Sequence, residues 1–317
     1  DITYTTSPAP NNGAETVSVS FTGGIRTWTI NPAFLTGGGI VTVDVTNILD
    51  PSTTTNCERV ITMLNATFEL IADPDPSDTQ VVVDDVCIGN DGIATISDAG
   101  GIGSIQLADG TYTITYTITP TGSSFTTTVI STGGNGTFSI PAAQIPTEGT
   151  TYTIEITNWE NAAGCTTASS IIDTFDVNPL PDAISIAISI PDICDGDDLI
   201  VTITDNSSPI VLVDGVYDIM YDIVGPPDLL GQTAFGLVIS GGTGSFTIPA
   251  GTLPFGTYSF TITNLLNTTT TCDTTTFSTP NTNFIIHEIP NAADVVLNVA
   301  DICLNSDAIV NISDANP

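Results

Sequence analysis

Residues 192–205 read DICDGDDLIVTITD, and related stretches occupy residues 85–98 and 301–314. Their cysteines, Cys87, Cys194 and Cys303, lie 107 and 109 residues apart (194 − 87 and 303 − 194). A period of this length is that of a whole small domain. The sequence therefore predicts a tandem array of similar domains.

Within each repeat, polar and apolar residues alternate with the period of two that is typical of β-strands. Tyr112, Ile114, Tyr116 and Ile118 share one face, and the threonines between them share the other. Short strands separated by turns predict an all-β fold of tandem immunoglobulin-like antiparallel β-sandwiches, each of about 108 residues. In residues 181–289 we expect seven strands, near residues 183–190, 198–205, 215–224, 233–239, 244–248, 257–264 and 273–287. The tyrosine-rich strands 215–224 and 257–264 are expected to face each other across the core.

The repeat boundaries predict four segments: a partial repeat in 1–72, complete repeats in 73–180 and 181–289, and a partial repeat in 290–317. The first segment matches the third to the last strand of a repeat, and the last segment matches the first two strands. The chain is therefore expected to be a segment of a longer protein. Short proline-containing linkers stiffen such junctions, so we expect a semi-rigid rod. These linkers are Asp73-Pro74-Asp75-Pro76, Asn178-Pro179-Leu180-Pro181 and Ile289-Pro290-Asn291.

The charge balance limits the partners of the chain. Two basic residues stand against 35 acidic ones, which gives a formal net charge of −33. Binding to phosphate backbones depends on Lys and Arg, so nucleic acid is excluded as a partner, and anionic membrane surfaces are disfavoured. No apolar run reaches the roughly 20 residues of a membrane span, so no membrane insertion is expected in this segment.

The six cysteines recur at fixed places in the repeat, which favours disulfides and an oxidising, extracellular location. Three pairings are open: within a repeat, between sequence neighbours, or across adjacent repeats. In an antiparallel sandwich the turns that carry Cys194 and Cys272 lie about 25 Å apart, whereas a disulfide requires Cα atoms within about 7 Å. Topology therefore favours Cys87–Cys272, across adjacent repeats, with the within-repeat pair as the main alternative. On this hypothesis, partners outside the segment pair with Cys57, Cys165, Cys194 and Cys303.

The sequence contains few residues that could form a catalytic or metal-binding site. The only histidine, His287, has no matching residue in the other repeats, and no His/Cys cluster has zinc-ligand spacing. We therefore expect that the chain is not an enzyme and needs no cofactor, with calcium as the one ion to consider. Carboxylate oxygens suit calcium, but acidic residues are also ordinary residues of exposed turns. The candidate calcium ligands are Asp192, Asp195, Asp197 and Asp198.

Several short motifs resemble those of a known family. The Asp-[Ile/Val]-Cys start, the stretch Gly256-Thr257-Tyr258 and the turn Gly164-Cys165-Thr166 resemble repeats of large Bacteroidetes cell-surface adhesins, including SprB-type gliding-motility adhesins. The resemblance implies a long surface fibre that is exported by type IX secretion and serves adhesion or gliding motility. It implies no catalytic residues.

Two functions compete on these observations. The first is a structural stalk or fibre segment of a giant extracellular adhesin or cell-surface filament, whose partners are neighbouring repeats of the same chain. The second is a ligand-binding module for a surface glycan, a protein or another cell. Trp159, which is expected to be exposed after its strand, would be the anchor of such a module. The position has no aromatic residue in the next repeat, where Leu265 stands.

Overall fold

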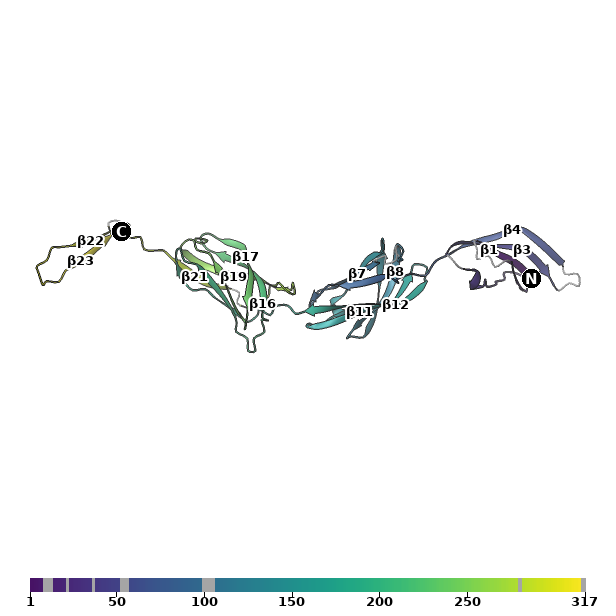
Figure 1. The fold of residues 1–317 in the computed structure, drawn as a ribbon, viewed down its shortest axis with the longest axis horizontal. Helices are drawn as coiled ribbons and strands as arrows, with labels where there is room; N and C mark the ends of the chain where they lie inside the picture. The colour runs from purple at the N-terminus through teal and green to yellow at the C-terminus, as the bar shows by residue number, and fades with distance from the viewer. Residues whose placement is uncertain are drawn as a thin grey trace. The chain divides into compact units, whose positions relative to one another are not determined.

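The computed structural model describes residues 1–7, 14–20, 23–35, 38–51, 57–98, 106–278 and 281–314. These residues form 23 strands and two short 3₁₀ helices, so the predicted all-β fold of immunoglobulin-like sandwiches is confirmed (Figure 1). By compactness the chain divides into two units. The first contains residues 1–84, 91–145 and 151–175, and the second contains residues 85–90, 146–150 and 176–317.

The first complete sandwich lies within residues 79–178 and consists of two sheets. The three-stranded sheet has the order β10 (Asn135–Ile140), β7 (Gly92–Asp98), β5 (Thr79–Val83). The five-stranded sheet has the order β6 (Val86–Cys87), β12 (Thr166–Asn178), β11 (Thr150–Asn161), β8 (Gly110–Thr119), β9 (Ser123–Ser131). A 3₁₀ helix, Ala142–Gln144, follows β10. The pairing of β6 with β12 is parallel, so this short strand extends the sheet beside the end of β12.

The second complete sandwich, within residues 186–287, repeats this order. Its smaller sheet is β13 (Ile186–Ser189), β15 (Leu199–Asp205), β18 (Thr243–Ile248). Its larger sheet is β14 (Ile193–Cys194), β21 (Asn281–His287), β19 (Gly256–Asn267), β16 (Gly215–Val224), β17 (Leu229–Ile239), with β20 (Asp273–Thr274) paired to β19. The predicted strand at 273–287 is therefore two strands, β20 and β21, and the one near 233–239 is longer and pairs with β16.

One expectation about the core is wrong. The tyrosine-rich strands β16 and β19 are neighbours in one sheet, with Tyr221 opposite Ile262, rather than partners across the core. The smaller sheet covers them instead, and its Val201 and Ile203 belong to the same buried cluster. Alternation identifies the buried face of a strand, but it does not identify the strand that lies beside it.

Two further groups of strands flank these sandwiches in the sequence. Residues 2–70 contain a four-stranded sheet in the order β2 (Glu15–Val17), β1 (Ile2–Ser7), β3 (Gly39–Asp50), β4 (Cys57–Leu70), and a 3₁₀ helix, Pro32–Phe34. β22 (Val295–Val299) and β23 (Val310–Asp314) form an antiparallel hairpin. The strands of each described sheet come from one of the four predicted segments, while the segment boundaries stay a prediction.

Candidate functional site

A disulfide joins Cys87 to Cys272, with an S–S distance of 2.03 Å and a Cα–Cα distance of 5.5 Å. Cys87 lies on β6, beside the end of β12, and Cys272 is a fully buried residue between β19 and β20. The bond connects residues 185 positions apart, one from each complete sandwich. The pair that topology favours is thus the pair that forms.

The other cysteines form no disulfide among the described residues. Cys194 and Cys303 are exposed and Cys165 is half-buried. Their pairing with cysteines outside the segment, like that of Cys57, stays a prediction.

The segment that precedes the first complete sandwich is held by side chains of that sandwich. The Thr167 hydroxyl donates to the Pro74 carbonyl at 2.6 Å, and the Asn161 amide donates to the Ala72 carbonyl at 3.0 Å. The Cys165 thiol donates to the Ile71 carbonyl at 3.8 Å. Because Pro74 is also buried, this linker is a packed element and not a loose tether.

The four candidate calcium ligands do not converge in the structure. The Asp192 carboxylate accepts a hydrogen bond from the Ile285 N–H at 2.8 Å, and Asp198 accepts one from the Ala250 N–H at 2.8 Å. Asp195 and Asp197 lie in the turn after β14. Across the described residues, no three His, Cys, Asp or Glu side chains are grouped so that they could hold a metal. Calcium stays the alternative to the expectation that the chain needs no cofactor, and two of the four candidate ligands already accept hydrogen bonds from backbone N–H groups.

That structural task recurs at aspartates in matching places of the two sandwiches. Each of these carboxylates accepts backbone N–H groups that the strand ladders leave unpaired. Sequence reasoning missed this role, although the recurrence of the aspartates was visible. The matched pairs are Asp85 and Asp192, Asp91 and Asp198, Asp98 and Asp205, and Asp109 and Asp214.

Asp205, at the end of β15, has the most strongly perturbed carboxylate. Its oxygens accept hydrogen bonds from the N–H groups of Ser207, Val211 and Leu212, each at 2.8 Å. Burial alone would raise the pKa of this carboxyl, but these hydrogen bonds favour the charged form and lower it to about 2. The side chain therefore fixes the loop between β15 and β16, including the buried Leu212.

Trp159 is fully buried, so the expectation that it is an exposed anchor is wrong. The register of β11 against β8 shifts between Ile156 and Asn158, which turns Trp159 back to the inward face, opposite Ile114. Its ring packs edge-on against Tyr112, at a centroid distance of 5.8 Å. Leu265 is buried at the matching place in the second sandwich, so this position belongs to the core.

His287 lies on β21, with its Nε2 3.8 Å from the Asp192 Oδ2, and both side chains are more than half exposed. Such an exposed pair contributes little to stability. The expectation that the chain is not an enzyme stays a prediction. No helix in the described part of the chain is long and apolar enough to cross a membrane.

Comparison with known proteins gives a structural likeness alone. No protein-family model matches the chain, and no curated protein matches it. Among solved structures, the crystal structure of the FN1–FN3 domains of chicken CNTN1 is similar, at 10% sequence identity and a TM-score of 0.46. The match covers 78% of this chain and 76% of that one. The fold assignment rests on the sheet order of the chain itself.

Proposed function

We propose that the chain is a structural stalk segment of a large extracellular adhesin or surface filament, and that it transmits tension between the cell and a distal contact. The disulfide supports an oxidising, extracellular location. The resemblance to SprB-type adhesins extends the proposal to gliding motility and type IX export. The ligand-binding alternative is less well supported, because Trp159, the residue expected to contact the ligand, is buried in the core.

The observation that carries the proposal is the Cys87–Cys272 bond. Tension applied to the two ends of the chain passes through this covalent bond and bypasses residues 88–271. These residues include most strands of both complete sandwiches, while β5, β6, β20 and β21 lie outside them. A stalk with such a bond transmits force without extending the chain between Cys87 and Cys272.

Single-molecule force spectroscopy tests this proposal on the full chain tethered at both ends. A fully extended chain spans about 3.3–3.6 Å per residue, so the loop of 185 residues hides roughly 610–670 Å of contour length. We expect this length to be absent from oxidised protein and to appear in Cys272→Ser. Cys194→Ser, which removes an exposed cysteine that forms no bond here, is the matched control and should behave as the parent protein.

Peptide mapping first verifies that the bond is present in the pulled sample. If oxidised protein then releases the loop length at the forces that unfold Cys272→Ser, the bond does not carry the tension and the stalk proposal fails.

A further inference from the structure

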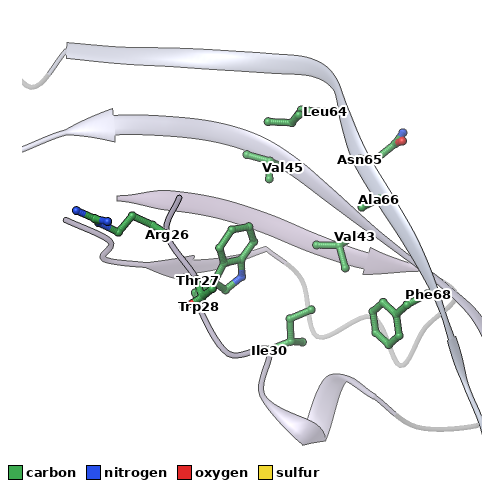
Figure 2. Close-up of a pocket in the computed structure, with 10 residues that line it drawn as sticks. All are labelled: Arg26, Thr27, Trp28, Ile30, Val43, Val45, Leu64, Asn65, Ala66 and Phe68. Atoms are coloured by element: carbon green, nitrogen blue, oxygen red, sulfur yellow. The ribbon is translucent and has the colours of Figure 1, made fainter. Parts of the chain in front are cut away.

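The cavity of about 450 Å³ that Trp28, Val43 and Phe68 line lies on the four-stranded sheet of residues 2–70 (Figure 2). The sequence predicts a partial repeat there, so this open face indicates no partner. A second apolar hollow, of about 330 Å³, lies within the second complete sandwich, on its larger sheet. It crosses strands β17, β16 and β19, and its lining includes Phe235 and Met220.

A β-bulge in the edge strand β17 presents Phe235 to solvent. The register of β17 against β16 shifts so that two residues, Phe235 and Gly236, stand opposite Asp218 alone. The Asp218 carboxylate accepts a hydrogen bond from the Gly236 N–H at 2.8 Å, and Gly236 has a φ of +69°, which favours glycine. Phe235 is 80% exposed, more than any other large apolar side chain among the described residues of the complete sandwiches. The bulge therefore directs an aromatic ring away from the core.

The first complete sandwich is built differently at this place. Its edge strand β9 pairs with β8 in an unbroken register, without a bulge. Three neighbouring positions also differ, since threonine or glutamate stands there in place of the apolar and acidic residues of the hollow. The fold of the repeat therefore does not require the hollow. The matched positions, with the second sandwich given first, are Met220 and Thr115, Leu266 and Glu160, and Asp218 and Thr113.

Two carboxylates belong to the lining of this hollow, those of Asp218 and Asp273. The Asp273 carboxylate accepts a hydrogen bond from the Asn264 amide at 2.7 Å. A carboxylate has two oxygens with several acceptor sites, so both groups can accept further hydrogen bonds. An exposed aromatic ring beside carboxylates suits an arginine. Its planar guanidinium stacks on the ring and pairs with a carboxylate through two N–H groups, while its methylenes cover apolar neighbours such as Met220.

Such a cation has to come from another kind of molecule. The two arginines of the chain are Arg26 and Arg59, and residues 73–317 contain neither lysine nor arginine. A second copy carries the same net charge of −33 and is repelled as a whole. Charge complementarity therefore favours a basic partner.

We propose that the hollow binds an arginine-bearing segment of a different protein. The guanidinium stacks on Phe235 and pairs with the carboxylate of Asp218 or Asp273. This site gives the stalk a lateral contact, in addition to the force that it transmits along its length.

Methyl NMR on the full chain tests the proposal, because the chain has two methionines. Met220 lines the hollow, whereas Met63 lies on β4 and is 92% exposed, so ¹³C-methyl labelling supplies one reporter and one internal control. One probe is a capped pentapeptide with two arginines around a valine and glycine at each end. The other is its citrulline analogue, which keeps the shape of arginine and removes the charge. Salt at about 150 mM limits the general attraction of a cation to an acidic chain.

We expect the arginine peptide to shift the Met220 signal in a saturable manner and to leave the Met63 signal in place. The citrulline peptide should bind roughly threefold more weakly or worse, because the cation–π contact and the ion pair are lost. Equal shifts of both methionines would show non-specific attraction. An unchanged Met220 signal, or equal affinity of the two peptides, would show that the hollow does not recognise arginine. Each of these results overturns the proposal.

Two double variants locate the binding. Phe235→Leu with Asp273→Asn removes the ring and one charge from the hollow, and should weaken binding of the arginine peptide by roughly threefold or more. Phe255→Leu with Asp197→Asn makes the same replacements at other exposed positions of this sandwich and is the matched control, with the affinity of the parent protein.

Equal affinity of the two double variants would place the binding elsewhere and overturn the proposal. Circular dichroism verifies that each variant folds, which is expected because the replaced side chains are exposed. The test of the stalk function is separate, since the pulling experiment on the Cys87–Cys272 bond contains no partner.

Discussion

Replacement of Asp205 by Asn should remove a specific, pH-dependent part of the stability of the second complete sandwich. Asp205 keeps its charge in the folded state because three backbone N–H groups donate to it. Its pKa is about 2 when folded, against 3.8 for the unperturbed group, and this difference corresponds to roughly 2 kcal/mol. A lowered folded-state pKa stabilises the protein above pH 4, and this stabilisation disappears as the pH falls from about 4 through 2.

Urea unfolding at several pH values measures this contribution. The chain has two tryptophans, and both lie outside this sandwich, so its transition is the one seen by circular dichroism but not by tryptophan fluorescence. We expect the parent protein to lose about 2 kcal/mol more than Asp205→Asn between pH 5 and 2, and the variant to be destabilised by roughly 2–4 kcal/mol at pH 7. Asp197→Asn removes the same charge from an exposed turn and is the control. If both variants match the parent in stability and in pH dependence, the role assigned to Asp205 is wrong.

Three further outcomes are expected. Trp159→Ala should destabilise the first complete sandwich by roughly 3–5 kcal/mol in urea unfolding, whereas a side chain that served ligand binding alone could be removed at little cost. Calcium should leave the melting temperature unchanged, and a calcium-dependent rise that is lost in Asp195→Ala with Asp197→Ala would establish the calcium interpretation instead. The melting temperature should increase as sodium chloride rises from about 10 to 150 mM, because the Debye length falls from about 30 to 8 Å and self-repulsion is screened. A decrease would indicate that attractive charge pairs dominate.

The strands were predictable because their residues alternate and because turns separate them. The predicted strand at 215–224 coincides with β16, and the strand predicted at 198–205 begins one residue before β15. The pairing of strands was not predictable in the same way. Both sheets of a sandwich bury similar residues on their inner faces. The alternation in β16 and β19 is therefore compatible with two arrangements, in which the strands are neighbours in one sheet or face each other from different sheets.

Trp159 illustrates a second limit. Continued alternation from Ile156 would place residue 159 on the outward face, and only the irregular register after Ile156 returns it to the core. A β-bulge of one residue cannot be recognised from the alternation within a single repeat. The same irregularity precedes the buried Leu265, so comparison of the repeats offered a signal, since both residues are large and apolar.

The cysteine pairing could be chosen from the sequence because strand direction alone separates the two turns within a repeat. The hydrogen bonds of the aspartates could not be predicted from the sequence, because their donors come from other strands or from loop residues several positions away. Asp198, for example, accepts from Ala250, which is 52 residues further along the chain. An acidic turn next to a linker looks the same in sequence whether its carboxylates face a cation, water or a backbone amide.

The aspartates also explain how a chain with a formal charge of −33 and two arginines can fold without a matching set of cations. Asp218 and Asp222 accept from the N–H groups of Gly236 and Gly231, and Asp214 accepts from that of Gly241. In each of these bonds, which lie at exposed sites, the partial positive charge of a backbone N–H takes the place of a basic side chain. These carboxylates are therefore satisfied although lysine and arginine are almost absent.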